Sequence, residues 1–305
     1  MPEAQPVTSP KWHPPGKGTT AAYHLGLFGA VAIWASTFIN IKVVLLQFPP
    51  NTIAFLRFLL AGAALSPYLR SPVAIGRRDQ WRLCACGLTG VTLYNFLQNQ
   101  GLRWAGSTDA AIMASMAPVF LALGAWLLLR ERIAGVQAAG IVIALAGSVL
   151  VVTAGTFSGV ALNPLRIYGD VLVMLTGAAW AVYSILAKSL LARYPAPTVL
   201  AWSTLTGTLF LLPLALAEMP FDFHAVTLSG WLNILYLGLA ASALAYLAWN
   251  LALTRVRAVT AAAYIYLIPV LTAGMAAIYY HQPPGLFVVI GGLTVLAGTY
   301  LTGRS

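Results

Sequence analysis

The stretch that decides the fold is Trp34–Lys42, with the sequence WASTFINIK, because it occurs twice. It returns 146 residues later at Trp180–Lys188, as WAVYSILAK. The two copies share the tryptophan, the alanine after it, the isoleucine at the sixth position and the final lysine. The sequence therefore predicts an internal duplication.

Further matches extend this duplication along the chain. Thr52 matches Thr198 at the same offset of 146 residues, and Pro118 matches Pro269 at an offset of 151. Each half contains five apolar stretches of membrane-spanning length, and an odd number of crossings inverts the second half relative to the first. Two inverted halves around a midplane site are typical of secondary transporters.

The composition also indicates a membrane protein. Of the 305 residues, 60% are hydrophobic and 8% are charged, whereas soluble proteins average about 25% charged residues. A bilayer core needs about 20 apolar residues per helix, so the chain has room for ten. The predicted spans are 22–44, 51–69, 83–102, 107–129, 135–154, 168–191, 197–217, 229–252, 258–280 and 285–301.

These spans predict an all-α integral membrane protein in three parts. Residues 1–21 are polar and rich in proline, and we expect a disordered cytoplasmic tail there. Residues 22–154 form the first five-helix repeat, and residues 168–305 form the second, inverted repeat. Since one chain holds both repeats, it can work as a monomer, and the sequence requires no dimer.

Basic residues predict the orientation in the membrane. If the N-terminus is cytoplasmic, 13 of the 17 Lys and Arg residues lie on the cytoplasmic side. Lys42, Arg103 and Arg166 lie on the other side, and Arg57 lies inside a span. By the positive-inside rule, both termini are cytoplasmic. The net charge of +10 is scattered among loops, so we expect the lipid bilayer as partner and no nucleic acid.

Polar side chains in mid-membrane are costly unless they face protein or water. The third span contains Asn95, Gln98 and Asn99, whose spacing places them on one helix face. The eighth span contains Tyr246, Trp249 and Asn250 with the same spacing. We expect both faces to line a substrate cavity; the alternative is hydrogen bonding that holds helices together.

Aromatic residues add to this expected cavity wall. Trp34 and Trp180 lie near the middle of their spans, away from the interfaces where membrane tryptophans gather. Tyr183, Tyr264 and Tyr266 fall in the same central zone. Aromatic rings with a few amides suit an amphipathic solute such as an amino acid with a large side chain. Ordinary packing or lipid contact is the alternative.

Three further residues have two interpretations each. Arg57 is the one charge well within a span, and it either anchors a substrate carboxylate or pairs structurally with carbonyls or a loop acid. Pro118 and Pro269 match across the duplication, and proline inside a helix often produces a kink. Such kinks act either as hinges or as fixed features of the fold.

Several motifs resemble one family in order and spacing. They are Trp34-Ala35-Ser36-Thr37-Phe38, Arg57, Ala117-Pro118-Val119-Phe120 through Arg130-Glu131-Arg132, Gly169-Asp170, Trp180 to Ser184, and Tyr246 to Trp249. Together they resemble the EamA-type drug/metabolite transporters, and within that family the bacterial YddG-type amino-acid exporters. The resemblance implies a ten-helix basket around a central cavity. One departure is Gln282, which stands where the repeat would place an acid like Glu131.

The sequence therefore predicts an exporter of amino acids, including aromatic ones, in the bacterial inner membrane. None of the seven acids lies in a membrane centre, so we expect a facilitator working by alternating access without obligatory proton coupling. Enzymatic and metal-binding motifs are absent, and we expect neither catalysis nor a cofactor. The alternatives are a multidrug or other metabolite exporter of this fold, a channel-like pore, and a non-transporting scaffold.

Overall fold

In a computed structural model, the chain is described over residues 20–70, 74–104, 116–129, 133–153, 164–279 and 285–303, and it is helical over most of this length. Helix is present in each of the ten predicted spans, although the span predicted at 107–129 is described only from residue 116 onward. The predicted tail at 1–21 lies outside the described residues except for its last two, which belong to the first helix.

The helices of each half follow the predicted order. The first half contains α1 (Thr20–Leu45), α2 (Pro50–Leu65), η2 (Ser66–Arg70), α3 (Arg77–Cys86), η3 (Gly87–Leu93), α4 (Tyr94–Trp104), α6 (Ala117–Leu129) and α7 (Gly135–Thr153). The second half contains α8 (Pro164–Leu191), α9 (Ala196–Leu216), η4 (Phe223–Ala225), α10 (Leu228–Tyr236), η5 (Leu237–Leu244), α11 (Ala245–Leu253), α12 (Ala258–Ile265), α13 (Leu267–Tyr279) and α14 (Leu286–Gly303).

Four helical stretches in the described part of the chain are long and apolar enough to cross a membrane. They are Pro50–Arg70, Ile167–Leu191, Ala196–Leu216 and Leu228–Leu253. Shorter apolar helices occupy other predicted spans, among them Gly135–Leu150 and Leu286–Thr302. A membrane crossing at all ten spans, and the inverted relation of the halves, remain predictions.

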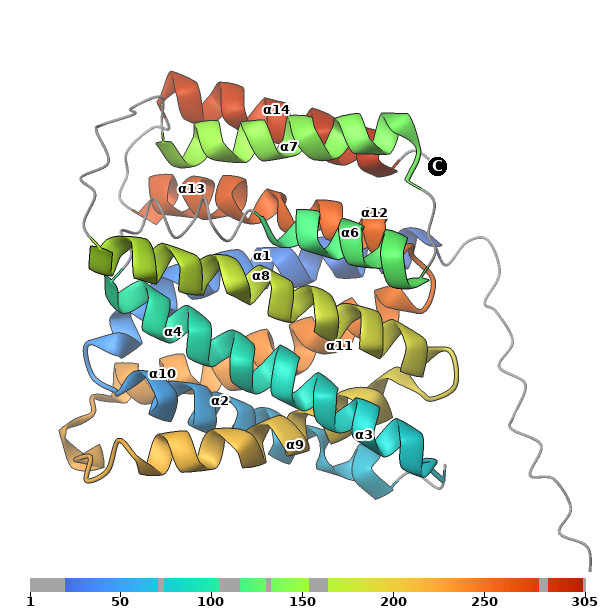
Figure 1. The fold of residues 1–305 in the computed structure, drawn as a ribbon. Coiled ribbons are helices and arrows are strands. Elements are labelled where there is room, and N and C mark those ends of the chain that lie inside the picture. Colours follow the sequence, from blue (N-terminus) through green and yellow to red (C-terminus); the bar gives the residue numbers. More distant parts are fainter. Residues whose placement is uncertain are drawn as a thin grey trace, which may run out of the picture.

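The helices run side by side with their axes roughly aligned (Figure 1). The α7–α14 pair lies at one end of the bundle, and α2, α9 and α10 lie at the other. Between them are α1 and α8, which carry the two copies of the duplicated stretch, together with α4 and α11. The duplicated tryptophans therefore lie in the middle of the bundle.

Small residues allow α7 and α14 to pack closely. A Cβ added at Gly140 would lie 2.7 Å from the carbonyl oxygen of Gly298, and one added at Gly147 would lie 2.7 Å from the backbone nitrogen of Val295. Real Cβ atoms essentially never come this close to backbone. Small residues of this kind let helices associate in lipid, where no hydrophobic effect drives them together.

The two matched prolines lie where helices begin. Pro118 is the second residue of α6, and Pro269 is the third residue of α13. The break between α12 and α13 falls at Tyr266, directly after Ile265. Ile265 is the residue whose carbonyl a helical Pro269 ring would meet four positions back. The proline therefore accounts for the break, and a hinge role remains a prediction.

Candidate functional site

Five aromatic side chains from both halves meet at the centre of the bundle. This central aromatic cluster consists of Trp34 on α1, Trp180 and Tyr183 on α8, and Tyr246 and Trp249 on α11. The ring centroids of Trp34 and Trp180 are 5.2 Å apart and their planes are nearly perpendicular. Trp34 also lies 5.7 Å from Tyr246 and 5.6 Å from Trp249. Edge-to-face contacts at such distances are favourable for aromatic pairs.

The cluster is closed in this structure. Tyr183 and Trp249 are fully buried, and Trp180 is 5% exposed. Trp180 contacts Tyr183 at 5.1 Å, Tyr246 at 5.3 Å and Trp249 at 5.4 Å. These rings fill the space between the halves, so the expected cavity wall is present as a packed cluster.

Two hydrogen bonds tie the cluster to backbone carbonyls. Trp34 Nε1 donates to the carbonyl oxygen of Ala241 at 3.1 Å, and the Tyr246 hydroxyl donates to that of Gly90 at 3.0 Å. Ala241 lies in η5 and Gly90 lies in η3, both of which are π-helical. A π-helix pairs residue i with i+5, and such segments are rare and often found at functional sites.

These π-helical segments were not predicted from the sequence. They occupy matching positions in the third helix of each half, because Gly90 and Ala241 are 151 residues apart, as are Pro118 and Pro269. The nearest signal is glycine, since Gly87 and Gly238 match at the same offset. Gly90 also has no room for a side chain, because an added Cβ would lie 2.5 Å from Tyr183 Cγ.

The predicted amides divide between two roles. Asn250 is fully buried and donates from Nδ2 to the Tyr183 hydroxyl at 2.6 Å. Asn99 donates to the carbonyl oxygen of Pro50 at 2.8 Å and so joins α4 to the start of α2. Gln98 donates to the Tyr94 hydroxyl at 3.4 Å. Asn250 therefore belongs to the central aromatic cluster, whereas Asn99 makes the helix-joining contact that the sequence left as an alternative.

Tyr264 and Tyr266 lie apart from the central aromatic cluster. The Tyr264 hydroxyl bonds to His24 Nδ1 at 2.8 Å, near the start of α1. Tyr266 is fully buried among apolar residues that include Val31 and Val295. The α12–α13 break at Tyr266 separates these residues from the register of one continuous helix, so sequence spacing alone could not place them.

Arg57 on α2 is buried, with 6% of its surface exposed. Its Nε donates to Ser242 Oγ at 2.8 Å, and its Nη1 donates to Asn95 Oδ1 at 3.4 Å. Asn95 in turn donates from Nδ2 to the carbonyl oxygen of Val91 at 2.7 Å. The guanidinium also lies 5.2 Å from the ring centre of Phe58. Its partners are therefore neutral groups of η5, α4 and α2.

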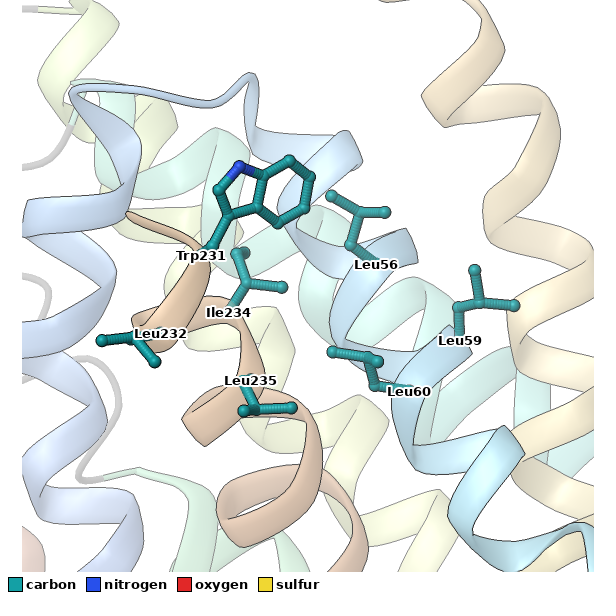
Figure 2. Close-up of a pocket in the computed structure, with 7 residues that line it drawn as sticks. All are labelled: Leu56, Leu59, Leu60, Trp231, Leu232, Ile234 and Leu235. Carbon is teal, nitrogen blue, oxygen red and sulfur yellow. The ribbon is translucent and has the colours of Figure 1, made fainter. Parts of the chain in front are cut away.

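The opposite face of α2 is apolar. Together with α10 it borders a groove of about 290 Å³ at the edge of the bundle (Figure 2). The lining residues are Leu56, Leu59, Leu60, Trp231, Leu232, Ile234 and Leu235. This groove contains no polar group that could orient a solute, so we do not assign it as the substrate site.

Acidic residues join the two halves at the ends of the bundle. Glu218 accepts hydrogen bonds from the backbone nitrogens of Asn51 and Thr52, at 3.0 and 2.7 Å, at the start of α2. Asp79, at the start of α3, pairs with Arg193 and accepts a bond from the Tyr194 hydroxyl at 3.0 Å.

The Asp79 contacts also determine its charge. Burial opposes ionisation of the carboxyl group, but the Tyr194 hydrogen bond and the charges of Arg193 and Arg82 outweigh it and lower the pKa of Asp79 below its usual value. Neither acid was predicted as a functional residue. The available signal is that each follows the second helix of its half.

The described residues contain no group of three or more His, Cys, Asp or Glu side chains that could hold a metal ion. Cys84 and Cys86 are both free thiols.

Comparison with known proteins identifies the family. The model of the "EamA-like transporter family" matches twice, over residues 21–153 and 167–304. This match confirms the resemblance seen in the sequence motifs. A solved crystal structure superimposes with a TM-score of 0.78 at 21% identity, covering 92% of this chain and 96% of the other.

The relatives carry the names of transporters, not of enzymes. An "Uncharacterized transporter" of Archaeoglobus fulgidus is 35% identical, with 92% of this chain and 96% of the relative covered. A "Probable terminal-alkyne amino-acid exporter" of Streptantibioticus cattleyicolor is 31% identical, with 90% and 91% covered. A "Probable amino-acid metabolite efflux pump" of Salmonella typhimurium is 28% identical, with 89% and 91% covered.

Proposed function

Because the chain belongs to the EamA-like transporter family, we propose that it exports amino acids, aromatic ones included, across the bacterial inner membrane. Members of this family are multi-pass membrane proteins that carry small molecules. We place both termini in the cytoplasm, in keeping with the distribution of basic residues. Amino acids are chosen as cargo because two relatives are named for amino-acid export.

The observation that carries the proposal is the central aromatic cluster. Trp34 comes from the first half, and Trp180 and Trp249 come from the second. Flat aromatic surfaces with a few polar groups suit the side chain of a large amino acid. The buried amide of Asn250 supplies a polar group within the cluster.

Transport then proceeds by alternating access. The two five-helix halves, inverted relative to each other, rock about the cluster and expose it to one side at a time. The packed rings correspond to a closed state, since Trp34 meets Trp180 at 5.2 Å with no room for a solute between them. Separation of these two rings opens the site for cargo.

We further propose that transport is facilitated and needs no proton. The described acids Asp79 and Glu218 lie at helix ends and bind groups of the opposite half. A carrier coupled to protons commonly holds a carboxylate in the membrane centre. The cargo gradient therefore drives the cycle.

Flux measurements in proteoliposomes test the proposal. Labelled tryptophan, phenylalanine, threonine and methionine are supplied to the purified protein, with and without an imposed pH gradient. Saturable uptake that stops at equal concentrations supports an amino-acid facilitator. Accumulation that requires the pH gradient refutes the absence of coupling, and absence of flux for all four refutes the amino-acid cargo. Uptake that never saturates and shows no counterflow indicates a channel-like pore instead.

A further inference from the structure

We infer that Arg57 binds the carboxylate of the transported molecule, so that the cargo must carry a free carboxylate. This inference rests on the proposed function and makes it more specific. It names one residue and one chemical group of the cargo.

The first observation is a buried cation without a carboxylate partner. Arg57 is 6% exposed, and no acid pairs with it among the residues that the structure describes. Arginine remains charged in proteins, and a charge in the membrane interior is costly unless it is paired or solvated. Asp79 and Glu218 already bind groups at the ends of the bundle. A cargo carboxylate is the partner that Arg57 lacks.

The second observation is the position of Arg57 beside the central aromatic cluster. Its partner Ser242 follows Ala241, the residue whose carbonyl accepts the Trp34 hydrogen bond. Phe58, next to Arg57, lies 5.8 Å from Tyr246 of the cluster. The Arg57 charge also interacts electrostatically with Tyr246. A molecule held by Arg57 through one end therefore has aromatic rings beside its other end.

The third observation is spare hydrogen-bonding capacity in and around the cluster. A guanidinium has five N–H donors, and the two hydrogen bonds of Arg57 leave three of them available for a carboxylate. Trp180 Nε1 and Trp249 Nε1 are buried donors without a partner, and Asn250 Oδ1 is a buried acceptor without one. An amino acid supplies the complementary groups: carboxylate oxygens for the donors and an ammonium for the acceptor.

The geometry also suits a carboxylate better than a single acceptor. Arginine binds carboxylates through two parallel hydrogen bonds, which are stronger than bonds to neutral oxygens. The existing bond to Asn95 Oδ1 is long, at 3.4 Å, and is the easier of the two to give up. Ser242 holds Nε at 2.8 Å and so keeps the guanidinium oriented toward α4 and the cluster.

The competing explanation is structural. Through Ser242 and Asn95, Arg57 joins α2 to η5 and α4, and this linkage alone might be why the side chain is buried there. A purely structural Arg57 has no effect on which chemical groups the protein accepts. The two explanations therefore differ in what they predict for analogues that lack a carboxylate.

Inhibitor analogues test the inference on the unaltered protein. Uptake of labelled tryptophan into proteoliposomes is inhibited with tryptophan, N-acetyltryptophan, tryptophanamide and tryptamine. We expect tryptophanamide and tryptamine to need about 10- to 100-fold higher concentrations than tryptophan, the loss expected for a hydrogen bond to a charged group. N-acetyltryptophan keeps its carboxylate and should remain within about tenfold of tryptophan.

Two outcomes would overturn the inference in different ways. Equal inhibition by all four compounds removes the carboxylate requirement and leaves amino-acid transport in place. Absence of any tryptophan flux overturns the proposed function, and the carboxylate site with it.

Variants assign the effect to Arg57. We expect Arg57→Gln to raise the half-saturating tryptophan concentration by about 10- to 100-fold and to abolish the preference for tryptophan over tryptophanamide. Arg57→Lys keeps the charge and should keep part of the preference. Arg103→Gln, which removes an exposed cation from α4, is the matched control and should change neither. If Arg57→Gln transports every compound more slowly but retains the preference, Arg57 is structural.

Discussion

The matched tryptophans allow one hydrogen bond to be measured by changing the same residue type twice. Trp34 and Trp180 occupy equivalent positions of the two halves and face each other at 5.2 Å. Trp34 Nε1 donates to the Ala241 carbonyl at 3.1 Å, whereas Trp180 Nε1 is buried without a partner. We predict that Trp34→Phe destabilises the protein more than Trp180→Phe does.

The magnitude follows from the groups that each change leaves behind. Both changes replace an indole by a smaller ring and cost packing of about 1–2 kcal/mol. Trp34→Phe also leaves the Ala241 carbonyl without its donor, at a further cost of about 1–3 kcal/mol. Trp180→Phe removes an unpaired buried donor, which recovers part of its packing loss. The expected difference is about 2 kcal/mol, or roughly 30-fold in the unfolding equilibrium.

Equilibrium unfolding of the purified variants in mixed micelles measures this difference. Trp180 is the more deeply buried of the two, with 5% of its surface exposed, so packing alone predicts the opposite order. Equal stability of the two variants, or greater loss in Trp180→Phe, would refute the hydrogen-bond argument.

Three further predictions concern the framework around the cluster. Gly298→Ala should cost about 1–3 kcal/mol in thermal unfolding, because its Cβ would lie 2.6 Å from the Gly140 carbonyl oxygen, while Gly274→Ala, with open space around it, should not destabilise. Asp79→Asn should lower stability at neutral pH, and its difference from the wild type should shrink as pH falls below the ordinary value of 3.8, because a carboxyl with a lowered pKa stabilises only while ionised; a difference that persists in acid would contradict this. Pro118→Ala should slow transport of tryptophan without loss of folded protein, and unchanged flux would exclude a hinge at that position.

The centre of the fold was predictable because the duplication carries it. Trp34 and Trp180 share a position in their halves, and two helices related by an inverted repeat bring equivalent residues to the same depth. The same reasoning applies to Tyr246, Trp249 and Asn250, whose spacing of three and four places them on one helix face. The ring contacts of Tyr246 and Trp249 agree with that prediction.

The rest depends on features that spacing does not encode. Tyr264 and Tyr266 were assigned to the cavity wall, but the helix breaks at Tyr266, and their contacts are to His24 and to a separate apolar cluster. The π-helical segments shift the register by about one residue per turn, so Gly90 and Ala241 present carbonyls that an α-helical count hides. In helices that are apolar on every side, sequence patterns give little information about which face is buried.

The two halves are alike in sequence but differ in hydrogen bonding. Gly90 and Ala241 are equivalent positions, and each carbonyl accepts one bond from the cluster. Ala241 receives it from Trp34, whereas Gly90 receives it from Tyr246, and Trp180, the counterpart of Trp34, remains without a partner. Under the proposed alternating access, a closed contact on one side must correspond to an open one on the other. A change of state that brings Trp180 to the Gly90 carbonyl forms one hydrogen bond as the Tyr246 bond breaks, so its net cost is small. The asymmetry of the cluster is thus the difference expected between two inverted halves held in one conformation.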